Sequence, residues 1–177
     1  MKFLSPSRIL PSGRAGRGFT LLEVLVVIAI IGILLGLSYP SIVNSMRVRS
    51  LENAARTIAT DLQWAKLQAV KTKMNHRLRF ALQSGVWFMT LERETQSTVW
   101  NLMPGYTTRS ISSDINVAVA LPNDGVIYNP LGLVDNFNAA LNNVTLQSDR
   151  LKNQGQADVR MILIFAGGTV QYVRTAS

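Results

Sequence analysis

An almost unbroken apolar run from Phe19 to Leu37 constrains this chain more than any other feature of its sequence. Only Thr20 and Glu23 interrupt the run with polar side chains. As a helix, the run would extend about 28 Å, which is close to the thickness of the hydrocarbon core of a bilayer. A carboxylate inside such a span is costly and persists only where it has a partner or a function. We therefore expect a transmembrane helix over residues 19–40, in which Glu23 has a specific role.

The run is preceded by residues 1–18, a basic segment rich in Pro, Gly and Ser that shows neither a helical nor a strand period. Such a segment is typical of a flexible leader. Its basic residues are Lys2, Arg8, Arg14 and Arg17, and it contains no acidic residue. Because positive charges are retained in the cytoplasm, this asymmetry predicts a cytoplasmic leader and an extracytoplasmic location for everything after Leu37.

Much of the basic character of the chain comes from this leader. The full sequence has 18 Lys and Arg against 10 Asp and Glu, a formal charge of +8, and removal of the four leader cations leaves 14 against 10, or +4. A charge of that size is weak evidence for a nucleic-acid partner. The chain has no cysteine, which excludes disulfides and thiolate metal sites.

A helical pattern continues beyond the apolar run. Apolar side chains recur at spacings of four and three, which predicts one buried face made of Leu51, Ala55, Ile58, Leu62, Ala65 and Ala69. Polar residues fall elsewhere on the helical wheel, namely Glu52, Arg56, Asp61, Gln63 and Lys66. We expect residues 41–75 to form an amphipathic continuation of the same helix, with a bend at Pro40 and an end near Lys73.

From residue 76 onward the pattern is typical of strands, so residues 76–177 are expected to form an antiparallel β domain. The clearest hairpin turns are Gln83–Gly85 and Ala166–Gly168. The expected strands are Arg77–Leu82, Val86–Leu91, Thr98–Leu102, Ile115–Leu121, Val126–Asn129, Val144–Gln147, Val159–Phe165 and Thr169–Arg174. The predicted fold class is α+β, with a long N-terminal helix whose second half packs on an antiparallel β-sheet.

The string from Gly18 to Glu23, set between a basic leader and an apolar span, resembles the class III signal of type IV prepilins and type II secretion pseudopilins. The resemblance implies that a prepilin peptidase cuts between Gly18 and Phe19 and N-methylates Phe19. It also implies that Glu23 neutralises the N-terminal amine of a neighbouring subunit, and that Pro40 is a helix-bending proline. A glycine before the cut has a physical reason, since its backbone enters a protease cleft without a side-chain clash.

Beyond this signal, the chain resembles the GspH/FimT group of minor pilins and pseudopilins. The similar parts are the helix Ala54–Ala69 leading to a strand at Arg77, the segment Asp124–Gly132 and the closing strand pair. Membership implies a structural subunit that primes or caps a type IV pilus or a type II secretion pseudopilus. Its implied partners are other pilins or pseudopilins and an inner-membrane assembly platform, with the domain in the periplasm. The choice between pilus and pseudopilus stays open.

Two simpler explanations of the N-terminus were weighed. A secretory signal would have a shorter apolar core and a small-x-small cleavage site, which Ser38–Pro40 fits poorly. A plain membrane anchor would explain the span and the leader. It would not explain Glu23 or its spacing from Gly18.

The alternative function is that of a DNA-binding minor pilin for natural transformation. Cations cluster where the helix meets the sheet. With His76 among them, they are Lys66, Lys71, Lys73, Arg77 and Arg79. Arg174 follows near the end of the chain. Such a group can contact phosphates, but cations at a helix end also complement the helix dipole. The arginine-rich tail motif of DNA-binding members is missing, since Thr169, Val170 and Gln171 follow the last glycine.

The sequence does not favour an enzyme, and no cofactor is expected. A single histidine and scattered carboxylates supply neither a nucleophile with its base nor a ligand set for zinc. Asp135, Asn136 and Asn138 carry oxygens suited to calcium, but Asp and Asn also cluster in turns, which is the interpretation that we prefer. The three tryptophans are expected in the core, namely Trp64, Trp87 and Trp100.

Overall fold

The structure is a computed structural model that describes residues 19–177, apart from the side chains of residues 37–41. The described part divides into two compact units, the first ending at residue 41 and the second formed by residues 42–177. Helix α1, Leu21–Thr72, contributes to both units, and each is described by itself. The leader residue Gly18 lies outside the described residues, as does the side chain of Pro40, so the bend expected there stays a prediction.

In the first unit, every described side chain from Phe19 to Gly36 is exposed. None of the helices within the described residues is long and apolar enough to cross a membrane. The transmembrane helix expected over residues 19–40 is therefore not confirmed there, and its last four side chains lie outside the described part.

In the second unit, the predicted face of α1 forms the centre of the core. All six of its predicted residues are fully buried: Leu51, Ala55, Ile58, Leu62, Ala65 and Ala69. The spacing of four and three places these side chains on one stripe, which is why the prediction is confirmed. Asp61, which lies off this stripe on the helical wheel, is also buried, at 3% exposed.

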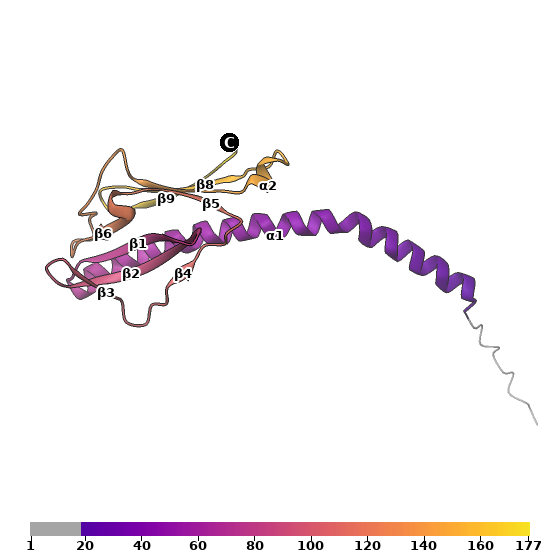
Figure 1. The fold of residues 1–177 in the computed structure, drawn as a ribbon, viewed down its shortest axis with the longest axis horizontal. Coiled ribbons are helices and arrows are strands. Elements are labelled where there is room, and N and C mark those ends of the chain that lie inside the picture. Colours follow the sequence, from indigo (N-terminus) through magenta and orange to yellow (C-terminus); the bar gives the residue numbers. More distant parts are fainter. Residues whose placement is uncertain (1–18) are drawn as a thin grey trace, which may run out of the picture. The chain divides into compact units, whose positions relative to one another are not determined.

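One sheet, called sheet A, has the order β3-β2-β1-β6, with β4 also paired to β2 (Figure 1). Its strands are β1 (His76–Gln83), β2 (Val86–Gln96), β3 (Val99–Leu102), β4 (Arg109–Ser110) and β6 (Gly125–Tyr128). Ser84 and Gly85 both have positive φ angles, 49° and 79°, as a two-residue hairpin turn requires. The predicted first hairpin is confirmed, whereas the two-residue strand β4 was not predicted.

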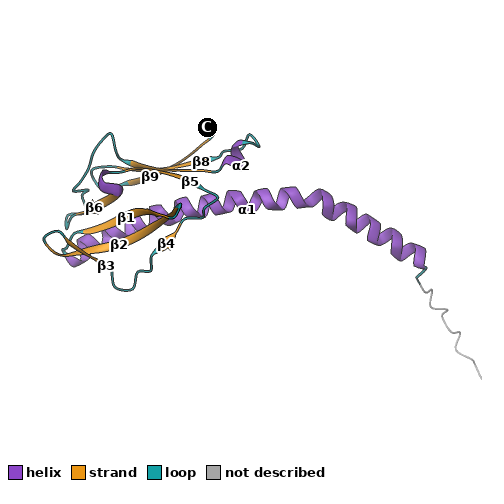
Figure 2. Cartoon of the chain, in the orientation of Figure 1, coloured by secondary structure: helices purple, strands orange, loops and turns teal. Residues whose placement is uncertain are grey.

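The other sheet, called sheet B, is antiparallel with the order β5-β7-β8-β9. Its strands are β5 (Asn116–Ala120), β7 (Asn143–Gln147), β8 (Val159–Ile164) and β9 (Val170–Thr175). Strands β5, β8 and β9 are labelled in Figure 2. A 3-10 turn (Pro122–Asp124) precedes β6, and the short helix α2 (Asp149–Lys152) precedes β8. The expected strands of sheet B are confirmed with differences of one residue at their ends, whereas β2 in sheet A extends five residues beyond its expected end at Leu91.

The core joins α1 to both sheets. Buried side chains come from the helix, from sheet A through residues such as Phe80 and Leu91, and from sheet B through residues such as Leu146 and Ile162. Trp64 and Trp87 are partly buried against this cluster. Trp100 is not part of it: its ring lies 4.3 Å from the Arg77 guanidinium carbon, so the core prediction for Trp100 was wrong. The α+β prediction is confirmed.

Candidate assembly site

The N-terminal turn of α1 is ordered by Thr20. Its carbonyl oxygen accepts hydrogen bonds from the backbone N–H groups of Glu23 and Val24, at 3.1 and 3.3 Å. Its hydroxyl oxygen accepts a further bond from the Glu23 N–H group, at 3.2 Å. Thr20 is thus the N-cap residue, and Glu23 is the acidic residue three positions later that such caps favour.

This position gives Glu23 a local role beside the predicted intermolecular one. A carboxylate in the first turn interacts favourably with the positive end of the helix dipole. The Glu23 side chain is exposed, so its carboxylate is accessible to a partner. Phe19 lies four residues earlier, just before the cap, and is 81% exposed. The structure therefore leaves the Glu23 carboxylate accessible and exposes Phe19, the residue on which the predicted cut would create the amine.

The surface that follows this turn is apolar. Phe19, Leu21, Val24, Leu25 and Ile28 line a shallow depression of about 450 Å³. Leu21 is 84% exposed and Ile28 is 64% exposed, although such side chains normally avoid water. A continuous apolar surface of this kind marks a site of interaction with lipid or with another protein.

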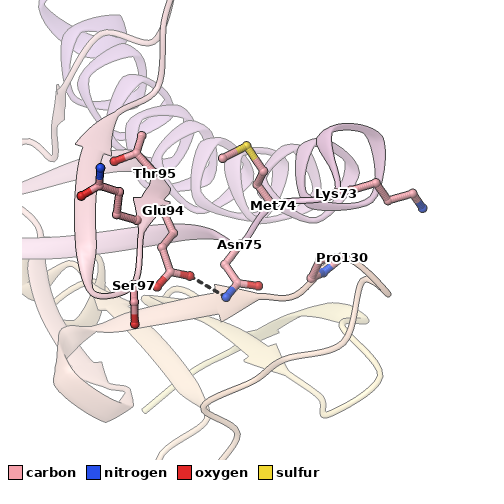
Figure 3. Close-up of a pocket in the computed structure, with 8 residues that line it drawn as sticks. Lys73, Met74, Asn75, Glu94, Thr95, Ser97 and Pro130 are labelled. Carbon is pink, nitrogen blue, oxygen red and sulfur yellow. Dashed lines mark hydrogen bonds between the residues drawn. The ribbon is translucent and has the colours of Figure 1, made fainter.

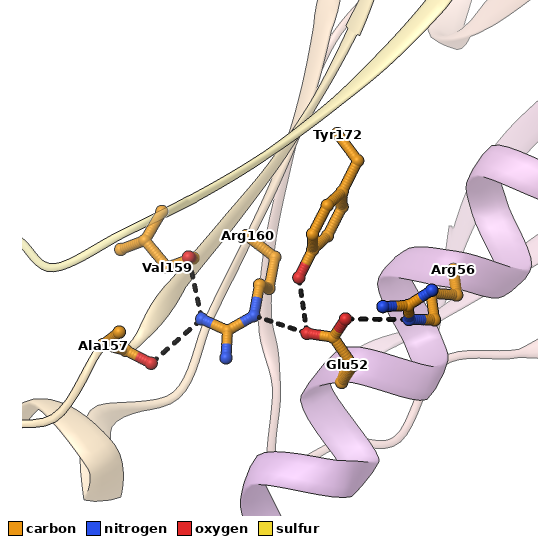
Figure 4. Close-up of polar contacts among 6 residues, drawn as sticks. All are labelled: Glu52, Arg56, Ala157, Val159, Arg160 and Tyr172. Carbon is orange, nitrogen blue, oxygen red and sulfur yellow. Dashed lines mark hydrogen bonds and ion pairs between the residues drawn. The ribbon is translucent and has the colours of Figure 1, made fainter.

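In the second unit, a polar cluster connects α1 to sheet B (Figure 4). Arg160 on β8 is fully buried, and its Nε donates to Oε2 of Glu52 at 3.0 Å. The Tyr172 hydroxyl on β9 donates to the same oxygen, and Arg56 donates to Oε1 of Glu52 at 2.8 Å. The hydrogen bond from Tyr172 holds the pKa of Glu52 below its usual value against the opposing effect of burial, and Arg160 and Arg56 also lower it. This cluster, defined by Glu52, Arg56, Arg160 and Tyr172, is called the Glu52 clamp.

A buried carboxylate, that of Asp61, connects α1 to the segment before β4. Asp61 accepts a hydrogen bond from the Tyr106 hydroxyl at 2.8 Å, and Arg109 lies 3.6 Å away. Tyr106 also stacks on Trp64, with ring centroids 6.0 Å apart. Burial raises the pKa of Asp61 despite the opposing effects of Tyr106 and Arg109. Neither Asp61 nor Glu52 was recognised as structural from sequence, because their partners lie far along the chain.

The predicted basic group is only partly available to a ligand. Arg77 forms an ion pair with Glu92 and lies over Trp100. The Lys66 ammonium donates to the Gly167 carbonyl oxygen at 3.0 Å. The side chains that remain exposed are Lys71, Lys73 and Arg79. Arg174 is exposed on β9, in the other sheet. The structure therefore does not gather these cations into one patch with Arg174.

The oxygen-rich segment at residues 135–138 is used by the fold itself. The Asn136 amide oxygen accepts from the Ile127 N–H at 2.9 Å, and its amide nitrogen donates to the Gly125 carbonyl at 2.9 Å. Asn138 accepts from the Ala140 N–H at 2.9 Å, as in an Asx turn. These contacts support the turn interpretation over a calcium site.

Comparison with known proteins gives the family context of this geometry. The prokaryotic N-terminal methylation motif matches residues 13–39, which include the junction of Gly18 and Phe19. The pilin-like protein PilA1 of Thermus thermophilus is 46% identical over 55 residues, which is 31% of this chain and 34% of that protein. The match thus spans about a third of the length of that relative.

One solved structure extends the similarity to the fold. The minor pseudopilin EpsH of the type 2 secretion system of Vibrio cholerae has a TM-score of 0.53 at 9% identity, over 70% of this chain and 96% of that chain. The type IV minor pilin FimU of Pseudomonas aeruginosa has a TM-score of 0.46 at 16% identity, over 69% and 91%. The chain thus carries the N-terminal methylation motif at the start of its long helix and is similar in fold to the minor pseudopilin EpsH.

Proposed function

We propose that the chain is the precursor of a minor pilin or pseudopilin, a structural subunit that primes or caps a type IV pilus or a type II secretion pseudopilus. The observation that carries this proposal is the exposed apolar surface at the start of α1, interrupted by the single carboxylate of Glu23. A helix that is apolar all round requires cover on every side. Lipid provides that cover before assembly, and the helices of neighbouring subunits provide it in a filament.

The precursor is inserted in the inner membrane with its leader in the cytoplasm and residues 42–177 in the periplasm. Prepilin peptidase cuts between Gly18 and Phe19 and methylates the new amine. The methylation motif at residues 13–39 supports this processing. The leader cations are lost in the cut, so the mature subunit has the lower charge of +4 (14 basic against 10 acidic residues).

The Phe19 amine that the cut creates explains why the apolar run contains the carboxylate of Glu23. Glu23 pairs with the Phe19 amine of an adjacent subunit on the assembly platform, and together they fix the stagger of the helices. In low dielectric, misplacement along the axis leaves both charges unpaired, which costs several kcal/mol. The accessibility of Phe19 and of the Glu23 side chain supports this role.

Processing is tested by intact mass of the membrane-extracted chain from a host that has prepilin peptidase. We expect the mass to correspond to residues 19–177 with one added methyl group. A Gly18→Val variant should retain the full precursor mass, and Gly16→Val is the matched control that should still be cut. If the wild-type mass is unchanged in that host, cleavage at this junction does not occur.

The stagger of neighbouring subunits along the filament is tested separately, by co-purification with the other subunits after in-cell cross-linking. Glu23→Gln should be cut normally yet recover far less of its partners, because it removes the charge and keeps the shape. Asp135→Asn, which removes an exposed carboxylate of the second unit, is the control and should assemble like wild type. Equal recovery of partners by Glu23→Gln and wild type would remove the register argument while leaving processing intact.

A further inference from the structure

The connection between α1 and sheet A is a three-residue turn held by side chains (Figure 3). Lys73 has a left-handed backbone, with φ of 58°. The Asn75 amide donates to Glu94 on β2 at 2.6 Å, and the Glu94 N–H donates to the Asn75 carbonyl at 2.9 Å. A cleft of about 440 Å³ lies beside this turn, lined in part by Met74 and Asn75. Water therefore reaches the connection directly.

The next residue is His76, the single histidine of the sequence and fully buried. It begins β1 and shares the core face of that strand with Leu78 and Phe80, since alternate residues of a strand point the same way. Its partners in register are Arg93 on β2 and Tyr128 on β6. Three polar side chains thus form one row across three strands, called the His76 row.

Each member of the His76 row has a buried polar atom that no other described group satisfies: Arg93 Nε, His76 Nε2 and the Tyr128 hydroxyl. His76 Nδ1 lies 3.0 Å from the Met74 carbonyl oxygen. A carbonyl only accepts hydrogen bonds, so Nδ1 carries the proton of the neutral ring and Nε2 has the lone pair. This bond ties the ring to the turn at Met74 in either protonation state, because Nδ1 keeps its proton when Nε2 is protonated.

A second proton, on Nε2, would place a buried positive charge next to the Arg93 guanidinium. No carboxylate within the described residues balances it. Glu92 and Glu94 alternate with Arg93 along β2 and are engaged by Arg77 and Asn75. On the other strand Tyr128 is neutral, because burial raises the pKa of its hydroxyl.

The last buried position of α1 is Ala69, and Val134 bridges to Tyr128 from the loop after β6. Burial lowers the pKa of His76; the Met74 carbonyl opposes this, and the charge of Arg93 adds to it. The fold therefore favours the neutral ring.

We propose that the His76 row is an acid-sensitive latch, in which neutral His76 keeps the turn between α1 and β1 closed and its protonation opens that turn toward the neighbouring cleft. The direction of the pH dependence of stability follows from the lowered pKa of His76. Stability is fully present above the ordinary histidine value of 6.5 and is lost as the pH falls below it toward the folded-state value. One proton is involved, so the folding equilibrium constant falls by at most about tenfold per pH unit.

The test uses the full chain in detergent micelles, unfolded with urea between about pH 7.5 and about pH 5, where histidine is the side chain that ordinarily titrates. Tryptophan emission reports on the second unit, because all three tryptophans lie there. We expect the wild type to lose stability on acidification and His76→Gln to lose much less. Tyr128→Phe, which removes no charge, should retain the wild-type pH dependence. Equal pH dependence of the wild type and His76→Gln would overturn the latch.

A second measurement does not depend on the variant folding. The Hε1 resonance of the only histidine should titrate below 6.5 in the wild type, and Arg93→Gln should raise its midpoint. Amide exchange at residues 73–76 should accelerate over the same pH range. A histidine midpoint at or above 6.5, or unchanged exchange at these residues, would overturn the proposal.

Discussion

Arg160 on β8 donates a hydrogen bond to Glu52 on α1 across 3.0 Å, although the two residues are 108 positions apart in the sequence. The guanidinium is fully buried, whereas the carboxylate is 24% exposed. A buried cation depends on its counter-ion, so this contact makes the attachment of α1 to sheet B sensitive to a single charge.

Glu52→Gln is therefore expected to destabilise the second unit by about 2–3 kcal/mol, since it leaves the Arg160 charge uncompensated. The two carbonyls that accept from Arg160 Nη1 keep the cost at the lower end of the range. Urea unfolding followed by tryptophan emission measures the change. Arg56→Ala is the control: its side chain is 70% exposed, and its loss should cost about 0.3–0.5 kcal/mol. Equal effects of the two variants would contradict the assigned importance of Arg160.

Asp61→Asn should be tolerated or slightly stabilising near neutral pH, because an amide oxygen can still accept from Tyr106 and the buried charge is removed. Asp61→Ala should cost about 1–3 kcal/mol, because it leaves the Tyr106 hydroxyl without its acceptor. The raised pKa of Asp61 means that the folded state binds its proton more tightly than the unfolded state. The wild type should therefore gain stability relative to Asp61→Asn as the pH falls toward 3.8, and lose that gain as the pH rises.

Gly168→Ala should destabilise the chain by about 1–3 kcal/mol or more, whereas Gly167→Ala should be nearly neutral. Gly168 has a φ of 71°, and a Cβ there would lie 2.2 Å from the Gly132 carbonyl oxygen. A Cβ on Gly167 would meet nothing within 4 Å, and the carbonyl that receives Lys66 would be kept. Thermal unfolding of the two variants measures the difference, and equal melting temperatures would contradict the close approach of the two loops.

Acid should also destabilise the end of sheet B, because protonation removes the charge of Asp158. Burial opposes its charge, but hydrogen bonds from Gln147 and Ser177 lower its pKa to about 2. Its contribution to stability is present above the ordinary value of 3.8 and is lost as the pH falls toward 2. Asp158→Asn should flatten the stability profile in that window, and an unchanged profile would show that the hydrogen bonds do not favour the charged form.

The affinity of the full chain for duplex DNA can be measured by filter binding at increasing salt concentrations. Contacts to phosphates make affinity fall steeply with salt. Lys71→Ala and Lys73→Ala should reduce any such slope, whereas Arg77→Ala should not, since Glu92 already engages its guanidinium. Binding that does not depend on salt would exclude phosphate contacts by this group.

Much of the fold was predictable because its signals are local. The buried face of α1 follows from the spacing of Leu51, Ala55 and Ile58, and the first hairpin follows from β-prone runs around Ser84 and Gly85. Strand β4 gave no signal, since two residues carry no period. The burial of Asp61 was not predictable, because helical spacing distinguishes faces but does not reveal a distant hydroxyl such as that of Tyr106.

For the candidate site, the positions of the residues were predictable but their partners were not. The positions of Phe19 and Glu23 follow from the apolar run, whereas their pairing involves another subunit, which one chain does not reveal. The Glu52 clamp and the His76 row depend on the register between strands, which sets Arg93 and Tyr128 beside His76. Register is a property of the assembled sheet, so sequence spacing alone does not give it.

The hydrogen bond from Lys66 to the Gly167 carbonyl spans 101 residues of sequence. Contacts of such high sequence separation form slowly, because a long loop must close before they contribute. Sheet A can pair on α1 early, since β1 and β2 are adjacent in the chain, but β8 and β9 complete the cover of the helix last. A chain delivered from its N-terminus therefore passes through a stage in which part of the buried face of α1 is still uncovered, and this stage is where aggregation or proteolysis would compete with folding.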